Sequence, residues 1–132
     1  MIYTEHMKFY IATRVLNEHN RNLAIKLKAF LEKAGHSNTF DWMNYKEDIK
    51  PYLKNVEKAS VFAKRDIDAV IEADFFIIIA DPDGRGMYVE LGAAIASRKK
   101  IFIIGEPKDS SVFNFYPGIK WVSDKEEILN NL

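Results

Sequence analysis

The sequence lacks cysteine, which excludes disulfide bonds, thiolate nucleophiles and metal sites built on cysteine. It also lacks an excess of either charge, because 19 Lys and Arg residues balance 19 Asp and Glu residues. Proteins that bind a nucleic-acid polymer typically present a basic surface, so this balance argues against such a partner. The apolar runs are far shorter than the roughly 20 residues that span a bilayer, and no membrane association is expected.

Histidine is scarce as well, and His6, His19 and His36 show no metal-binding spacing. We therefore expect no metal ion and no other cofactor, and an enzyme of this composition would depend on carboxylates. No basic stretch followed by an apolar one opens the sequence, so we expect no signal peptide and a cytoplasmic protein. With 132 residues, 48% of them hydrophobic, the chain is expected to form one domain over residues 1–132.

One stretch, residues 74–96, organises the predicted fold. The apolar run Phe75–Ala80 is typical of a strand buried on both faces of a parallel sheet. Turn-forming residues occupy Asp81–Gly86, and helix formers occupy Met87–Ser97. A strand, a turn and a helix in this order make half of a βαβ unit, whose turn lies where open α/β sheets bind ligands.

The rest of the chain continues this alternation of strands and helices. Further strands are predicted at Met7–Thr13, Thr39–Trp42, Lys100–Gly105 and Ile119–Val122. Helices are predicted before Gly35, over Glu57–Ala73 and over Asp124–Leu132, with a loop or broken helix at Asn44–Asn55 and a long loop at Glu106–Gly118. We therefore predict a doubly wound α/β domain, flavodoxin-like or Rossmann-like, with about five mostly parallel strands and helices on both faces.

Glu90 lies near the start of the helix that follows the central turn. A Glu at this place can simply complement the helix dipole. It can also be a carboxylate whose pKa the dipole lowers, so that it stays ionised in a ligand cleft and acts as a nucleophile. The turn itself, with Gly84 and Gly86, is neither a Walker loop nor Gly-x-Gly-x-x-Gly, but its backbone N–H groups can bind an anion or a sugar.

Two further side chains are candidates for the same site. Asp66 lies at the edge of the apolar stripe of its predicted helix, where it either pairs with Lys64 or Arg65 or faces a cleft as an acid with a raised pKa. Tyr10, in the middle of the first strand, is either a core residue or directs its hydroxyl into the site near Glu90.

Four stretches, in order along the chain, carry a family resemblance. They are Lys-Phe-Tyr-Ile-Ala-Thr at Lys8–Thr13, the pair Asp41 and Trp42, the pair Arg65 and Asp66 followed by Ile71–Asp74, and Gly-Met-Tyr-Val-Glu-Leu-Gly-Ala-Ala at Gly86–Ala94. Together they resemble the nucleoside 2-deoxyribosyltransferase family, which includes the 2'-deoxynucleoside 5'-phosphate N-hydrolases. The resemblance extends from Met7 to about Asn114.

The resemblance implies cleavage of the N-glycosidic bond of a deoxynucleoside, or of its 5'-monophosphate, with retention at the sugar. It makes Glu90 the nucleophile that attacks the anomeric carbon. Asp66 then protonates or orients the leaving base, and Tyr10 positions the nucleophile. Asn114 corresponds to a polar residue that reaches into a neighbouring subunit's site.

The sequence departs from the family pattern at two substrate-binding positions. Gly84 stands six positions before the nucleophile, where the family usually has a polar or acidic residue, so either the adjacent Asp83 takes that role or it is missing. Arg14 stands where the hydrolase branch has a small phosphate-binding Ser. Read on their own, Arg14, Asn17 and Arg21 either hold a phosphate or form a solvated face.

The chemistry also follows without the family. A glycosidic bond breaks through an oxocarbenium-like transition state, which an ionised carboxylate traps on one face while a proton donor assists the leaving group. Water as acceptor would make the enzyme a hydrolase and a second base a transferase, and the sequence leaves both open. Pro82–Glu90 also resembles the motif of the cytokinin-activating nucleotide phosphoribohydrolases, with Asp83 in place of Gly and Met87 in place of Thr. A nucleotide-sensing module without turnover is a third alternative.

The loop Ser110–Pro117 indicates the expected partners. It carries Phe113, Phe115 and Tyr116, which either fold back onto the domain's own core or form an interface between subunits. We expect a homodimer or a larger homo-oligomer that acts on a small nucleoside or nucleotide.

Overall fold

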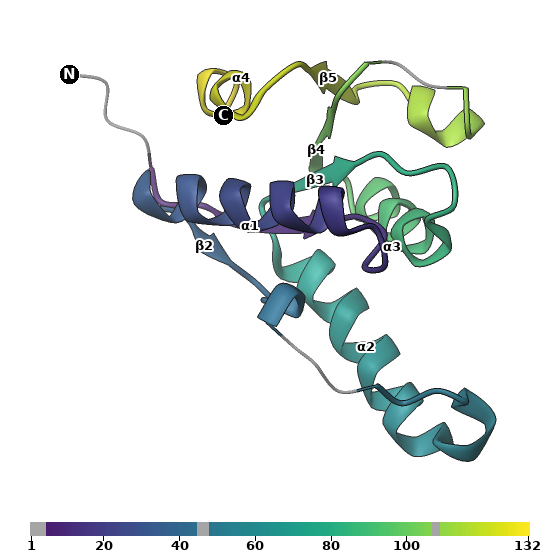
Figure 1. The fold of residues 1–132 in the computed structure, drawn as a ribbon. Helices are drawn as coiled ribbons and strands as arrows, with labels where there is room; N and C mark the ends of the chain where they lie inside the picture. The colour runs from purple at the N-terminus through teal and green to yellow at the C-terminus, as the bar shows by residue number, and fades with distance from the viewer. Residues whose placement is uncertain (1–4, 45–47, 107–108) are drawn as a thin grey trace.

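We describe the protein from a computed structural model, which covers residues 5–44, 48–106 and 109–132 (Figure 1). Its strands are β1 (Lys8–Ala12), β2 (Ser37–Asn38), β3 (Phe75–Ile79), β4 (Lys100–Ile104) and β5 (Lys120–Val122). Its α-helices are α1 (Glu18–Lys33), α2 (Val56–Glu72), α3 (Arg85–Ala96) and α4 (Lys125–Asn130). Its short 3-10 helices are η1 (Trp42–Asn44), η2 (Tyr52–Lys54) and η3 (Val112–Phe115).

The five strands form one sheet in the order β2-β1-β3-β4-β5, and all neighbours are parallel. The predicted doubly wound α/β fold is therefore confirmed. The chain passes from β1 to β2 on one side and then returns to place β3 on the other side of β1. The order thus reverses between β1 and β3, and a ligand site is expected at the carboxyl ends of these two strands.

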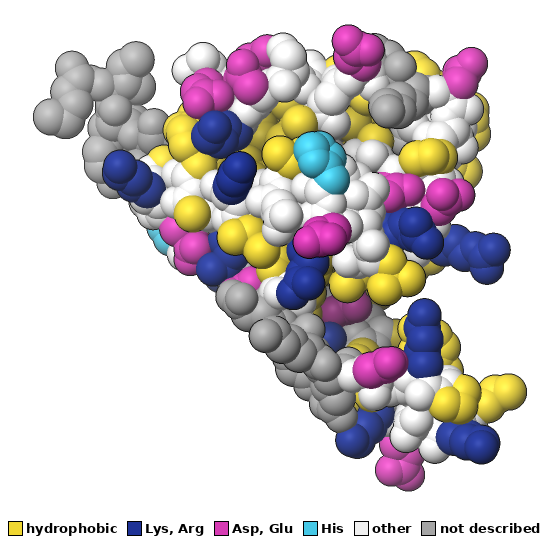
Figure 2. Space-filling model, in the orientation of Figure 1, with side chains coloured by type: hydrophobic (Ala, Val, Ile, Leu, Met, Phe, Trp, Pro, Cys, Tyr) yellow, Lys and Arg dark blue, Asp and Glu magenta, His cyan; other side chains and the backbone are white. Residues whose placement is uncertain are grey.

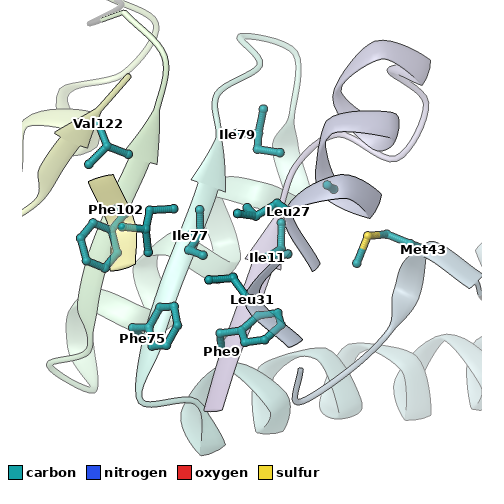
Figure 3. Close-up of a cluster of buried hydrophobic side chains, with 12 residues drawn as sticks. Phe9, Ile11, Leu27, Leu31, Met43, Phe75, Ile77, Ile79, Phe102 and Val122 are labelled. Carbon is teal, nitrogen blue, oxygen red and sulfur yellow. The ribbon is translucent and has the colours of Figure 1, made fainter. Parts of the chain in front are cut away.

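Side chains alternate between the two faces of the sheet, as the geometry of a strand requires. On one face, Phe9 and Ile11 of β1 and Phe75 and Ile77 of β3 pack under α1 and α4 (Figure 3). We call this the α1/α4 face, and each fully buried Phe or Ile on it stabilises the fold by about 1.5–3 kcal/mol.

The opposite face, which we call the α2/α3 face, is only partly covered. Tyr10, Phe76 and Ile78 pack there with residues of α2 and α3. Within α2, only Ala69 and Val70, near its carboxyl end, are buried. The amino-terminal half of α2 projects from the sheet together with η2 (Figure 1), and the surface is hollowed between this projection and the body (Figure 2).

The second strand differs from its prediction. It was expected at Thr39–Trp42 but lies at Ser37–Asn38, and Trp42 begins η1 instead. Thr39 N still donates to Phe9 O at 2.9 Å, but beyond it the indole Nε1 of Trp42 donates to Ile11 O at 2.6 Å. A side chain thus takes the place of a backbone donor from the edge strand, and pairing with β1 ends early.

The other helices, strands and loops expected from the sequence agree closely with the structure. The segment 44–55 contains the end of η1 and all of η2, with residues 45–47 outside the described part. The loop 106–118 contains η3, with residues 107–108 outside it. Asp124 caps α4, because its Oδ1 accepts from Glu127 N at 3.1 Å. Gly35 ends α1 with a φ of 99°, a left-handed conformation that glycine adopts without strain.

Candidate active site

A cavity of about 570 Å³ opens between the α2/α3 face of the sheet and the projecting half of α2. Its described walls comprise Tyr10, Thr13, Val15, Trp42, Asp48, Ile49, Tyr52, Ala59, Phe62, Ala63, Arg65, Asp66 and Glu90. The three residues predicted as catalytic, Tyr10, Asp66 and Glu90, are thus brought together from β1, α2 and α3. Within the residues that the structure describes, no cluster of His, Asp and Glu could hold a metal ion.

Tyr10 and Glu90 are in direct contact in this site. The Tyr10 side chain is 1% exposed, and its ring stacks on Phe76 with centroids 5.9 Å apart. Its hydroxyl donates to Glu90 Oε2 across the space between β1 and α3. The two predicted roles of Tyr10 are therefore combined, because the ring belongs to the core and the hydroxyl to the site.

The pKa of Glu90 is raised to about 8, which overturns the expectation that the helix dipole lowers it. Burial is the largest cause, and the negative charge of Asp66 adds to it, while the hydrogen bond from Tyr10 acts in the opposite direction. Glu90 lies in the second turn of α3, which begins at Arg85, and the dipole's influence falls off within the first turn. Burial therefore outweighs the dipole.

Tyr10 remains the proton donor of this pair. Burial raises the pKa of its hydroxyl far above the ordinary value, and the negative charge of Glu90 raises it further. The hydroxyl accordingly stays protonated at any physiological pH. It can hold one oxygen of Glu90 without competing for the role of base.

Asp66 lies on α2 beside Arg65, one of the two cations that were expected to pair with it. Arg65 Nη2 contacts Asp66 Oδ1 at 3.4 Å, whereas Lys64 pairs with Asp68. Burial raises the pKa of Asp66 above its ordinary value, and the charge of Arg65 partly opposes this. Asp66 therefore has the raised pKa that suits an acid, next to a cation that stabilises its ionised form.

The turn before α3 is fixed by a buried carboxylate that sequence reasoning missed. Asp81 is 4% exposed, and its Oδ2 accepts from Asn17 Nδ2 at 2.8 Å. Its Oδ1 accepts from Asp83 N at 2.9 Å. Asn17 in turn caps α1, because its Oδ1 accepts from Asn20 N at 3.0 Å. This chain of bonds ties the loop after β1 to the turn after β3, and so positions the start of the helix that carries Glu90.

Gly84 caps α3 at a close approach of the chain to itself. A Cβ at this position would lie 3.0 Å from Met87 Cε and 3.3 Å from Asp81 O. The polar or acidic side chain that is usual in the family six positions before the nucleophile would therefore crowd this turn. Gly86, by contrast, has open space around it.

The residues predicted to bind substrate are not gathered in the cavity. Its described walls include none of Arg14, Asp83, Gly84, Gly86 and Asn114. Asp83 is exposed, and Asn114 is 1% exposed, with its Nδ2 donating to Ser110 Oγ at 3.2 Å.

Two of the three residues considered for phosphate binding, Asn17 and Arg21, bind the protein's own atoms. Asn17 binds Asp81, and Arg21 Nη2 donates to Met43 O at 3.1 Å. Neither side chain lines the described part of the cavity.

Aromatic side chains that were given no role form much of the cavity wall. Trp42, Tyr52 and Phe62 line it together with Tyr10. For Phe62 a signal existed, since it lies one helical turn before Asp66 and so shares its face of α2. Trp42 was predicted to end a strand and belongs to a pair that carries the family resemblance, but neither pattern gave its side chain a role. Tyr52 comes from a segment without periodicity.

The comparisons with known proteins agree with this architecture. A family model described as nucleoside 2-deoxyribosyltransferase matches residues 9–132. No curated protein matches the chain with significant similarity. Within the described part of the chain, no helix is both long enough and apolar enough to cross a membrane.

Several solved structures share the fold. CMP N-glycosidase BcmB from Clostridium botulinum is 22% identical with a TM-score of 0.61, over 94% of this chain and 96% of that one. The 2-deoxyribosyltransferase from Bacillus psychrosaccharolyticus is 19% identical with a TM-score of 0.70, over 93% and 90%. A conserved protein from Enterococcus faecalis is 14% identical with a TM-score of 0.57, over 96% of each chain.

Proposed function

The chain belongs to the nucleoside 2-deoxyribosyltransferase family, and from this premise we propose that it cleaves the N-glycosidic bond of a nucleoside or nucleoside 5'-monophosphate through a covalent intermediate on Glu90. Membership indicates an N-glycosyl transferase or hydrolase. The observation that carries the proposal is the hydrogen bond from Tyr10 to Glu90 in a cavity that Asp66 also lines.

In the proposed reaction, ionised Glu90 attacks the anomeric carbon while the bond from that carbon to the base breaks. The electron pair of the broken bond goes to the base, and Asp66 gives the base its proton. Tyr10 holds Glu90 Oε2 by a hydrogen bond, so that Oε1 is available to the sugar. Water or a second base then attacks the glycosyl-Glu90 ester, loses its proton to Asp66 and restores both carboxyl groups.

This reaction requires one ionised carboxyl and one protonated carboxyl. The negative charge of Asp66 contributes to the raised pKa of Glu90, so the two carboxyl groups bind a proton more tightly than Glu90 would alone. Two neighbouring carboxyl groups with raised pKa values favour a state with a single shared proton. We propose that substrate binding places this proton on Asp66.

We propose two substrate classes, for which the similar structures give support. One similar structure is a 2-deoxyribosyltransferase, which makes deoxynucleosides candidate substrates of this chain. Another is a CMP N-glycosidase, which makes ribonucleoside monophosphates candidate substrates as well. Both classes pass through the same oxocarbenium-like transition state, so the roles of Glu90 and Asp66 are the same for each.

We further propose that subunits associate through η3 and its flanks. Phe113 is 60% exposed, Phe115 53% and Tyr116 46%, although Phe115 also lies against Trp121 with ring centroids 6.2 Å apart. Aromatic side chains exposed to this extent are typical of the buried centre of an interface. Asn114 lies within this segment, but its side chain is 1% exposed and donates to Ser110 Oγ, so it would have to turn outward to contact the partner's cavity. Sedimentation at working concentrations tests the assembly.

A screen for base release tests the proposed activity. Deoxynucleosides, ribonucleosides and their 5'-monophosphates are incubated with the protein, with and without a second base, and products are separated by chromatography. We expect free base, or an exchanged nucleoside, from at least one class, and none from the Glu90→Gln variant. Absence of both products from every class, with correctly folded protein, would contradict the proposal.

A further inference from the structure

Arg65 is held in an unusual way at the edge of the cavity. Its guanidinium carbon lies 4.0 Å from the ring centroid of Phe40 and 4.3 Å from that of Phe62. Phe62 precedes Arg65 by three residues on α2 and therefore shares its face, while Phe40 comes from the segment between β2 and η1. A guanidinium stacks on aromatic rings in a way that the ammonium of lysine does not.

The clamped guanidinium faces Asp66. Arg65 Nη2 contacts Asp66 Oδ1 at 3.4 Å, and the two side chains are 27% and 37% exposed. Within the described residues, Asp66 Oδ2 accepts no hydrogen bond, and Asp66 lines the cavity. One carboxylate oxygen is thus engaged by a fixed cation, and the other is available to a ligand.

We infer that Arg65, held against Phe40 and Phe62, is a positioning residue that orients Asp66 and keeps a cation beside it for proton transfer to the leaving base. This inference rests on the proposed function and deepens it. The cation stabilises the carboxylate that remains on Asp66 once the proton has moved to the base nitrogen. Without the cation, burial alone would make Asp66 a weaker acid, and it would transfer its proton less readily.

The same geometry explains why arginine suits this position. The ammonium of a lysine could supply the charge, but it would not stack on the two rings as a planar guanidinium does. The cation–π contacts fix the guanidinium on one side of Asp66, and a proton donor is effective only at a defined distance from its acceptor. Arg65 therefore contributes both a charge and an orientation, and these contributions can be separated by substitution.

The test uses four variants of the full chain. Arg65→Met removes the charge and keeps most of the side-chain length, and Arg65→Lys keeps the charge without the planar stacking. Phe40→Leu removes one ring and leaves Arg65 in place. Lys64→Met is the control, because it removes the same charge from the neighbouring residue of α2, which pairs with Asp68 instead. Thermal unfolding confirms that each variant is folded.

Two readouts are compared. The first is the pKa of the Asp66 carboxyl in the substrate-free protein, measured by carbon-13 NMR. We expect Arg65→Met to raise it by about one unit, Arg65→Lys to keep it near the wild-type value, and Lys64→Met to leave it unchanged. The second is base release from a series of substrates with bases of graded acidity. Arg65→Met should slow release of the poorest leaving base by up to about tenfold and release of the best leaving base much less.

Arg65→Lys and Phe40→Leu should show an intermediate loss of turnover at a nearly normal Asp66 pKa. In an Asp66→Asn background, Arg65→Met should cause no further loss, because Arg65 acts through Asp66. An unchanged Asp66 pKa in Arg65→Met, an equal loss for all leaving bases, or an additive loss in the Asp66→Asn background would overturn the inference. If the wild-type protein releases no base, the proposed function fails, and the NMR measurement still decides whether Arg65 controls Asp66.

Discussion

The two faces of the sheet are built from the same strands and differ in what they enclose. On the α1/α4 face, Phe9 and Ile11 of β1 lie in a cluster of apolar side chains that α1 and α4 cover. On the α2/α3 face, the alternate residue Tyr10 carries a hydroxyl that meets Glu90 where α2 leaves the sheet. The cavity therefore forms because α2 covers only part of the α2/α3 face.

This contrast assigns different tasks to neighbouring residues of a single strand. Phe9 and Tyr10 are both fully enclosed, at 0% and 1% exposed. Burial of Phe9 contributes stability alone, whereas burial around Tyr10 and Glu90 also raises the pKa values of both groups. Variants on the two faces should therefore separate stability from chemistry.

The largest effect is expected from Glu90→Gln on the α2/α3 face. Loss of a covalent nucleophile should reduce turnover by about a thousandfold or more, while the fold stays intact. Steady-state kinetics and circular dichroism measure the two effects. Glu72→Gln, at an exposed carboxyl paired with Lys8 at 3.2 Å, is the matched control and should keep full activity. Near wild-type base release by Glu90→Gln would remove Glu90 from the role of nucleophile.

The next effect is expected from Phe9→Ala on the α1/α4 face. It opens a cavity in the closed core and should lower the free energy of unfolding by about 3–5 kcal/mol. Turnover per folded molecule should stay within a small factor of wild type, since no part of the site is touched. Chemical denaturation with active-site titration measures both quantities. A loss of turnover per folded molecule without a fall in the free energy of unfolding would show that the two faces do not have separate roles.

A third effect concerns stability against pH. The folded pKa of Glu90 is about 8 and its ordinary value is 4.5, so the folded state binds a proton more tightly than the unfolded state. The resulting stabilisation is fully present below pH 4.5 and is lost as pH rises through about 8. Between these limits the wild type should lose up to about 1.4 kcal/mol per pH unit relative to Glu90→Gln. A difference in unfolding free energy between the wild type and Glu90→Gln that stays constant with pH would contradict the raised pKa of Glu90.

The smallest effects are opposite shifts of the pH–rate profile. The hydrogen bond from Tyr10 lowers the pKa of Glu90. Tyr10→Phe should therefore move the limb of the kcat/KM profile near pH 8 to higher pH. The charge of Asp66 raises the pKa of Glu90. Asp66→Asn should therefore move the same limb to lower pH. Each shift should amount to about one unit or less. Shifts in the same direction would show that the limb does not report Glu90.

The sequence predicted most of the fold because its central strands are continuous apolar runs. It also indicated Tyr10, Asp66 and Glu90 as a group, since parallel strands place their carboxyl ends at one edge of the sheet and the motifs resemble those of a family. It misplaced the second strand, because the indole of Trp42 replaces a backbone donor there. It gave the wrong direction for the pKa of Glu90, because burial depends on how α2 and α3 pack, which no local pattern records.

The central claim, a covalent intermediate on Glu90, is tested most directly by mass spectrometry. The protein is incubated with 2-fluoro-2-deoxynucleosides, whose fluorine slows breakdown of the glycosyl ester by destabilising the oxocarbenium-like transition state. A covalent intermediate on Glu90 predicts a mass increase of one fluorodeoxyribosyl group, located on the peptide that contains Glu90 and absent from the Glu90→Gln variant. Base release without any such adduct, or an adduct on another residue, would contradict it.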